Sequence, residues 1–179
     1  SKFSRLYARL IEVSNWYEDH LEAVTKSSSL GHVSAVPVLK RILENDQKEE
    51  RRKIAVQGLA KIKGKKALNV LGKVLLNDKH VEVREECAKA IGQFQGKEIV
   101  PHLAKALETE LDPMVRKEIV KSLGMARHKS AVPVIEKARE RFDETGVFSA
   151  FMRNGHPSAI PILEREIQEH PSNRYLAIE

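Results

Sequence analysis

Cysteine, aromatic residues and long hydrophobic runs are all scarce in this sequence of 179 residues. Its single cysteine, Cys87, excludes a disulfide within the chain and fits a reducing compartment. No apolar run approaches the roughly 18 residues that a membrane-spanning helix needs, and the first residues do not resemble a signal peptide. We therefore expect a cytoplasmic protein that has no membrane partner. Because the sequence starts at Ser1 without a methionine, we also expect it to be part of a longer chain.

Motifs that carry catalytic chemistry are missing as well. The sequence has no G-x-x-x-x-G-K-[ST] phosphate-binding loop, no G-x-S-x-G and no H-E-x-x-H. Its seven histidines are scattered, and none is spaced to place two metal ligands on one helix face. Cys87 shares its place in the repeat described below with Ala55 and Ile119, which indicates a small buried residue and not a nucleophile. We predict no catalytic residue, no metal ligand and no cofactor, and we expect the chain not to be an enzyme.

The sequence does contain an internal repeat with a period of 32 residues. It runs without gaps through residues 35–66, 67–98 and 99–130. The segment AVPVL at Ala35 returns as AVPVI at Ala131 and as AIPIL at Ala159, so the unit that starts at Ala131 is shortened. We predict a single array over residues 1–179, with units at about 3–34, 35–66, 67–98, 99–130, 131–158 and a partial unit at 159–179.

Each unit carries the pattern of two helices. Apolar residues recur at i, i+3 and i+7 along the first helix, as in the column Leu39, Leu71 and Leu103. Proline occupies the first turn of this helix, where its missing N–H costs nothing, and the serine before it is expected to cap the helix. The second helix has a column of small residues that permits close packing. The serines are Ser34, Ser130 and Ser158, and the small residues are Ala60, Gly92 and Gly124.

Two antiparallel helices joined by a short turn form a helical hairpin that cannot bury its apolar face alone, so successive hairpins are expected to stack. The pattern resembles the short HEAT-like repeats of the phycobilin-lyase type. The resemblance rests on the proline-bearing first helix, on EVREECAKAIGQF and MVRKEIVKSLGMA as second helices, and on the period, and it covers residues 35–135 well. It implies an all-α fold, an α-solenoid (α–α superhelix). HEAT-like arrays of one hydroxylase family hold iron with His-Glu dipeptides, and this sequence has none.

Charged side chains also recur with the repeat. One column contains Arg52, Arg84 and Arg116, and an acid, Asp46 or Asp78 in the first two units, precedes the arginine by six residues. This pattern is open to two interpretations: a ladder of guanidinium groups that binds phosphates or acidic peptides, or a structural ladder of arginine–carboxylate pairs along the stack. We favour the structural ladder, because each arginine lies on the same helical stripe as the buried positions that follow it.

The outward row of the second helices is basic. In HEAT stacks these helices line the concave face, where we expect the partner to bind. The candidate partner-binding residues are Lys53, Gln57, Lys61, Lys89, Lys117 and Lys121. The basic character is local, because residues 35–66 hold ten Lys or Arg and four acids, a net charge of +6 that equals the charge of the whole chain.

The leading hypothesis for function is a protein-interaction scaffold or adaptor that binds an acidic or helical protein segment. One alternative is a nucleic-acid-binding module. It is disfavoured because no aromatic platform interleaves with the lysines. A lesser alternative, implied only by the resemblance to phycobilin lyases, is a role in bilin attachment. In a further interpretation the row of lysines binds no partner and is simply a solvated face of the protein.

Overall fold

The computed structural model describes residues 33–142 and 146–170. Residues 3–32 of the predicted unit 3–34 and residues 171–179 of the partial last unit lie outside this description. In the described part of the chain every regular element is a helix, and no strand occurs. This agrees with the all-α fold that the repeat predicts.

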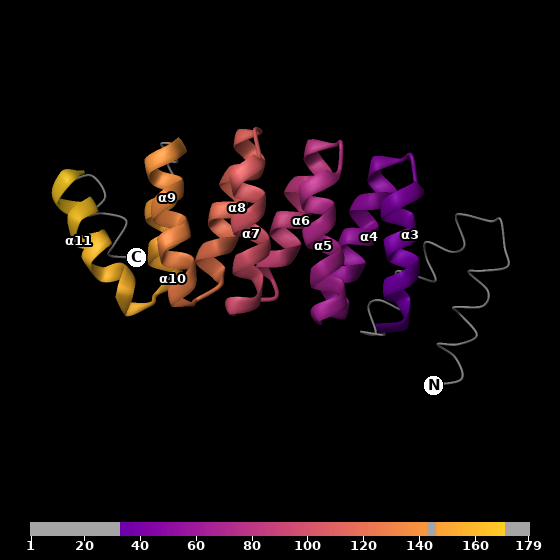
Figure 1. Cartoon of the computed structure of the whole chain (residues 1–179), viewed down its shortest axis with the longest axis horizontal. Coiled ribbons are helices and arrows are strands. Elements are labelled where there is room, and N and C mark those ends of the chain that lie inside the picture. Colours follow the sequence, from indigo (N-terminus) through magenta and orange to yellow (C-terminus); the bar gives the residue numbers. More distant parts are fainter. Residues whose placement is uncertain (1–32, 143–145, 171–179) are drawn as a thin grey trace, which may run out of the picture. The chain divides into compact units, whose positions relative to one another are not determined.

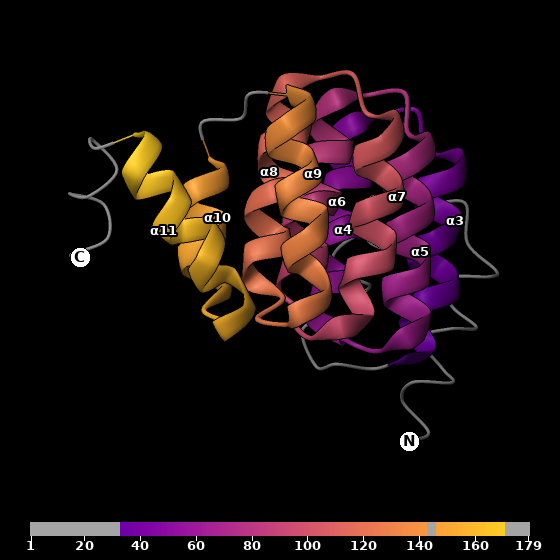
Figure 2. The same cartoon turned by 60° about the vertical axis from the view of Figure 1, so that its left-hand side comes forward.

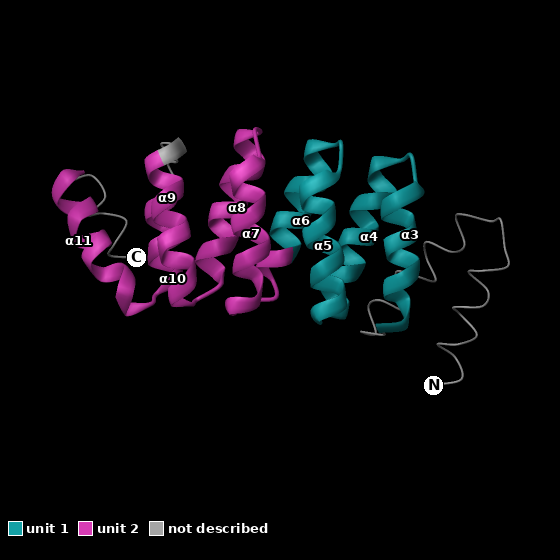
Figure 3. Ribbon diagram, in the orientation of Figure 1, with its two compact units in different colours: residues 1–90 teal, residues 91–179 magenta. Residues whose placement is uncertain are grey.

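The chain divides into two compact units, Ser1–Ala90 and Ile91–Glu179 (Figure 3). The described part of the first unit contains a short 3-10 turn, η1 (Val33–Ala35), and two helical hairpins. The helices of these hairpins are α3 (Val36–Asn45), α4 (Glu49–Ile62), α5 (Lys65–Asn77) and α6 (Val81–Gly92), whose last two residues belong to the second unit. In Figures 1 and 2 the first helices, α3 and α5, lie side by side, and the second helices form a layer behind them.

The second unit repeats this arrangement. Its hairpins are formed by α7 (Val100–Thr109) with α8 (Pro113–Met125), and by α9 (Val132–Phe142) with α10 (Val147–Asn154). Its last second helix, α10, has only eight residues. A further first helix, α11 (Ile160–Glu169), follows and packs on α10. Three 3-10 turns precede the first helices of this unit: η2 (Lys97–Ile99), η3 (Lys129–Ala131) and η4 (Pro157–Ala159).

The repeating leucine column forms the core in each unit. Leu39 and Leu71 in the first unit, and Leu103 in the second, are each no more than 1% exposed. The second helices contribute their predicted stripe to the same cores, with Leu59 and Leu123 fully buried. Each of these leucines removes an apolar side chain from water, which contributes roughly 1.5–3 kcal/mol per residue. Burial of equivalent positions is what a stack of similar hairpins requires.

The predicted serine caps are wrong, and histidines take their place in two turns. The residues before α3 and α11 are Ala35 and Ala159, and neither makes a side-chain cap hydrogen bond. Instead, Nδ1 of His128 accepts a hydrogen bond from the backbone N–H of Ser130 at 3.2 Å, and His156 does the same for Ser158 at 3.1 Å. A 3-10 turn precedes the proline-bearing helix. The capping residue therefore lies before that turn, closer to the N-terminus than the sequence pattern predicted.

Candidate functional site

The buried charged pair of the first unit links its two hairpins. Arg52, at the start of α4, is 3% exposed. Its Nε and Nη2 donate to the two carboxylate oxygens of Asp78, at 2.9 and 3.1 Å. Asp78 directly follows α5 in the next hairpin and has a side-chain exposure of 6%. This bidentate geometry holds the first turn of α4, in one hairpin, to the turn that joins the two helices of the next hairpin.

The arginine column also fixes the turn inside each hairpin. Nη1 of Arg52 donates to the backbone oxygen of Asp46 at 2.9 Å, and Nη1 of Arg84 donates to that of Asp78 at 3.0 Å. In the second unit, Nη1 of Arg116 donates to the backbone oxygen of Leu111 at 2.6 Å. These bonds satisfy carbonyl groups at the end of each first helix. Each of these three guanidinium groups therefore bonds within its own hairpin, and that of Arg52 also bonds Asp78 of the next one, a geometry that fits a structural role.

The lysines of the predicted partner-binding row are largely matched by acids. Lys53 lies 3.3 Å from Glu49 and 2.9 Å from Glu50. Hydrogen bonds to Glu50 and then to Glu49 raise the pKa of Lys53 against the opposing effect of its partial burial. Lys121 pairs with Glu118 at 3.0 Å. The side chains of Gln57 and Lys89 both reach Glu86, at 3.0 and 3.9 Å.

Lys61 and Lys117 are the row members with no carboxylate partner among the described residues. The row is thus a surface of alternating charge and not a uniformly basic face. Its role in partner binding stays a prediction.

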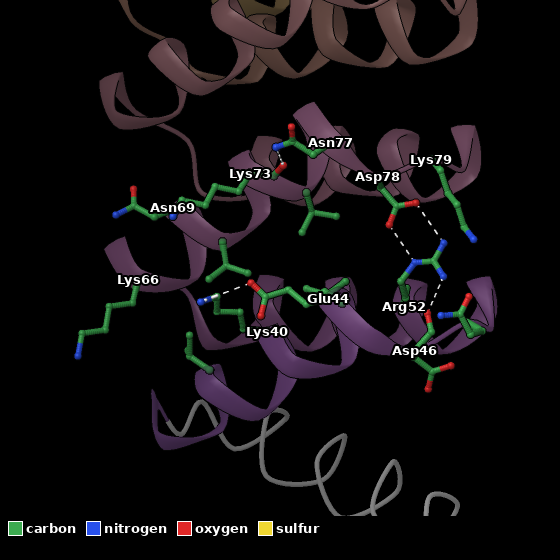
Figure 4. Close-up of a pocket in the computed structure, with 15 residues that line it drawn as sticks. Lys40, Glu44, Asp46, Arg52, Lys66, Asn69, Lys73, Asn77, Asp78 and Lys79 are labelled. Atoms are coloured by element: carbon green, nitrogen blue, oxygen red, sulfur yellow. Dashed lines mark hydrogen bonds and ion pairs between the residues drawn. The ribbon is translucent and has the colours of Figure 1, made fainter.

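A hollow in the first unit lies between α3 and α5, on the side of the first helices (Figure 4). This α3–α5 groove has a volume of about 750 Å³. Its floor is apolar, formed by Val36 and Leu43 of α3 and by Val70 and Val74 of α5. Its polar lining is formed by Lys40, Glu44, Asp46, Gln47, Arg52, Lys66, Asn69, Lys73, Asn77, Asp78 and Lys79.

Lysines dominate the rim of this groove. Lys40 is paired with Glu44 on its own helix, at 3.4 Å. Lys66, Lys73 and Lys79 are exposed and have no carboxylate partner within the described residues. Figure 4 shows Lys66 and Lys79 at opposite ends of the groove. An apolar floor surrounded by cations that no described carboxylate neutralises favours an amphipathic, acidic occupant.

The second unit has a smaller groove at the equivalent position, between α7 and α9, with a volume of about 260 Å³. The position of Lys40 is taken there by Ala104, two repeats later. Glu108, the equivalent of Glu44, therefore has no lysine on its own helix at that position. It reaches Lys137 of α9 at 4.0 Å and bridges the two rims. The sequence difference at one position thus accounts for an open rim in the first unit and a bridged rim in the second.

The structure also brings together three side chains that sequence reasoning left apart. Glu49 is the first residue of α4, His80 precedes α6 and Glu82 lies in the first turn of α6. Their donor atoms all lie within 4.8 Å of one another. The signal was the repeat itself, because residues about one period apart lie side by side in neighbouring hairpins, and Glu49 and His80 are 31 positions apart.

Cys87 is fully buried in α6, as its column predicted. Burial, with smaller contributions from the charges of Asp78 and Glu86, raises the pKa of its thiol well above the ordinary value. A protonated thiol that is closed off from solvent is a poor nucleophile. Its surroundings therefore favour a packing role.

Stacked two-helix hairpins with this burial pattern define the chain as an α-solenoid. The sequence model of HEAT repeats matches residues 68–145. Human deoxyhypusine hydroxylase, whose structure was solved in complex with glycerol, is similar to this chain with a TM-score of 0.56 and 26% sequence identity. The match covers 73% of this chain and 44% of the hydroxylase. The comparison with curated proteins finds no match.

The chain therefore contains HEAT-like repeats, matched over residues 68–145, and has the general architecture of a repeat-based scaffold. It spans less than half the length of the hydroxylase that it resembles. Across the part of the chain that the structure describes, no helix combines the length and the apolar character needed to cross a membrane.

The expectation that the chain is not an enzyme is wrong, because a protein of similar structure is one. That expectation was based on the absence of short catalytic motifs, whose residues lie close together in the sequence. In a stack of hairpins, functional side chains can come from separate repeats and leave no short motif in the sequence, as the approach of His80 to Glu49 illustrates. The missing motifs therefore do not exclude catalysis on this fold.

Proposed function

We propose that this chain is a protein-interaction module that binds an acidic, amphipathic helical segment of a partner protein in the α3–α5 groove. The observation that carries this proposal is the combination of an apolar floor with three rim lysines, Lys66, Lys73 and Lys79, that have no carboxylate partner among the described residues. An amphipathic helix places its apolar side chains every three or four residues on one face, where they meet the valines and leucine of the floor. Acidic side chains on its flanks then lie opposite the lysines.

The charge pattern favours this groove over the second-helix row. In the row, Lys53, Lys89 and Lys121 already have carboxylate partners. An acidic partner would have to displace those carboxylates, which offsets most of the Coulomb energy that it gains. At the groove, the partner's acids would supply neutralisation that the described residues do not. The rim charges would mainly increase the association rate, while the apolar floor would slow dissociation.

The test uses three synthetic helical peptides and fluorescence anisotropy. The first peptide has a leucine stripe with glutamate flanks, the second has lysine flanks, and in the third the leucines are replaced by serine. We expect only the first peptide to bind the full chain appreciably. Equal binding of the lysine-flanked peptide would refute the charge argument. Equal binding of the serine peptide would refute the role of the floor.

Charge-reversal variants locate the site. The groove variant Lys66→Glu/Lys73→Glu/Lys79→Glu should bind roughly 10-fold more weakly or worse, because three exposed ion pairs of up to about 1 kcal/mol each are lost. The control Lys97→Glu/Lys105→Glu/Lys129→Glu changes the net charge equally at three exposed lysines of the second unit. It should bind nearly as wild type does.

A third variant examines the predicted row. If Lys53→Glu/Lys61→Glu/Lys121→Glu weakens binding and the groove variant does not, the partner binds the second helices and the proposal is wrong.

A further inference from the structure

The group Glu49, His80 and Glu82 combines an imidazole with two carboxylates from two neighbouring hairpins. Nδ1 of His80 lies 3.0 Å from Oε2 of Glu49. One ligand atom from each of the three side chains lies within 4.8 Å of the other two. Donor atoms bound to one metal ion at about 2.0–2.2 Å each stand at most about 4.4 Å apart, so small side-chain rotations bring all three into range. The donors come from separate elements, which distinguishes the group from a simple acidic run.

The position of His80 is fixed by buried contacts. Its backbone N–H donates to Oδ1 of Asp78 at 2.9 Å. That carboxylate is held by the bidentate bonds from Arg52, which is 3% exposed. The turn that carries the imidazole is therefore anchored to the helix that carries Glu49. A ligand set held in place by buried hydrogen bonds loses little freedom when a metal binds.

The surrounding charges leave Glu49 available. Lys53 contacts Glu49 at 3.3 Å but has a second, closer acid in Glu50 at 2.9 Å. The ammonium group therefore keeps a partner when Glu49 turns to a metal ion. The N-terminal ends of α4 and α6 carry partial positive charge, which opposes cation binding, and the two carboxylates outweigh it.

We propose that Glu49, His80 and Glu82 form a binding site for a divalent transition-metal ion of the Zn²⁺, Co²⁺ or Ni²⁺ class. One nitrogen with two carboxylate oxygens suits these ions, whereas Ca²⁺ and Mg²⁺ are bound by oxygen alone. The metal accepts the Nδ1 lone pair from the His80 tautomer whose proton is on Nε2. The contact between Nδ1 and the Glu49 carboxylate is replaced by one metal bond to each group. Glu49 and His80 are half-buried and Glu82 is exposed, so water completes the coordination.

The experiment titrates Zn²⁺ into the full chain by calorimetry and follows Co²⁺ binding by its visible absorption. We expect one site in wild type. His80→Ala, Glu49→Gln and Glu82→Gln should each weaken Zn²⁺ binding by more than the roughly 10–100-fold that loss of an outer hydrogen-bond partner costs. The matched control is Glu140→Gln, which removes an equal charge at an exposed position outside the group. It should bind within about twofold of wild type, because this carboxylate acts on the site only through solvent-screened charge.

Three outcomes would overturn the proposal. The first is no uptake of Zn²⁺ by wild type at millimolar concentration, and the second is unchanged Zn²⁺ binding by His80→Ala. The third is displacement of Zn²⁺ by excess Mg²⁺, which would reveal an unspecific acidic patch. A measurement on wild type alone guards against variants that fail to fold. The imidazole NMR signals of His80 should shift on Zn²⁺ addition, and a shift confined to other histidines would also refute the site.

Discussion

Single residues at the turns decide how one hairpin meets the next. Asp78 accepts two hydrogen bonds from Arg52 and one from the backbone of His80. Both members of the ion pair are nearly out of contact with solvent. A buried pair of this kind contributes little compared with an apolar contact of the same shape, but breaking it leaves an uncompensated charge.

We expect Asp78→Ala to lower the free energy of unfolding of the first unit by about 3–5 kcal/mol, because Arg52 would stay buried without its partner. Urea unfolding followed by circular dichroism measures the change. The control is Glu136→Ala, which removes the exposed partner of Arg165 at 2.8 Å in the second unit. It should cost at most about 1 kcal/mol. Equal losses in the two variants would mean that the Arg52–Asp78 pair is not buried in solution.

At the scale of the helices, the small-residue column sets how closely second helices approach. A Cβ atom added at Gly124 of α8 would lie 2.7 Å from the backbone oxygen of Ala150 and 2.9 Å from its Cα. These are backbone atoms of α10, which cannot rotate away as a side chain does. At Gly92 the added atom would instead meet the side chain of Ser122, 2.6 Å from Oγ. Glycine is therefore required at both positions for the observed packing, more strictly at Gly124.

Gly124→Ala should destabilise the second unit by about 1–3 kcal/mol, because α8 and α10 would have to move apart. Gly146→Ala is the matched control, since Gly146 has an ordinary φ of −88° and an added Cβ would meet nothing within 4 Å. That control should be neutral or slightly stabilising. Thermal unfolding of both variants measures the difference. A Gly124→Ala protein as stable as the control would show that the two helices are not in close contact.

The sequence predicted these elements well for a physical reason. Apolar periodicity and prolines reflect burial and backbone geometry, which repeat in every hairpin. The burial of the Leu39 column and the close packing at the small-residue column could both be predicted from the period. The contacts between hairpins were harder to predict from the sequence, because they depend on the directions in which individual side chains point.

The groove shows this limit most clearly. Its rim is open because position 40 is a lysine, whereas the equivalent position two repeats later is Ala104. Glu44 pairs with Lys40 on its own helix and so does not bridge the groove. Likewise, the approach of Glu82 to His80 and Glu49 requires positions that differ between repeats. Repeat columns describe what units share, whereas a functional site is formed where one unit departs from the others.

At the scale of the whole molecule, the net charge of +6 raises the alternative of nucleic-acid binding. Charge alone gives attraction for any polyanion. The number of phosphates neutralised determines how steeply that attraction falls with salt. The second-helix lysines with carboxylate partners, such as Lys121 with Glu118, release few counterions when a polyanion approaches.

We therefore expect only weak binding of the full chain to a short labelled DNA duplex. If Lys66, Lys73 and Lys79, which have no carboxylate partner in the described part of the chain, supply the contacts, the slope of log Kobs against log salt should be about −3 between roughly 50 and 200 mM salt. Anisotropy titrations over that range measure it. The groove variant Lys66→Glu/Lys73→Glu/Lys79→Glu should flatten the slope, because it removes those contacts, whereas Lys97→Glu/Lys105→Glu/Lys129→Glu should leave it nearly unchanged. A slope steeper than about −6 in wild type would require that many phosphate contacts. It would then favour a nucleic-acid interface over a groove for a protein segment, because the three groove lysines that lack a carboxylate partner among the described residues are too few to produce that slope.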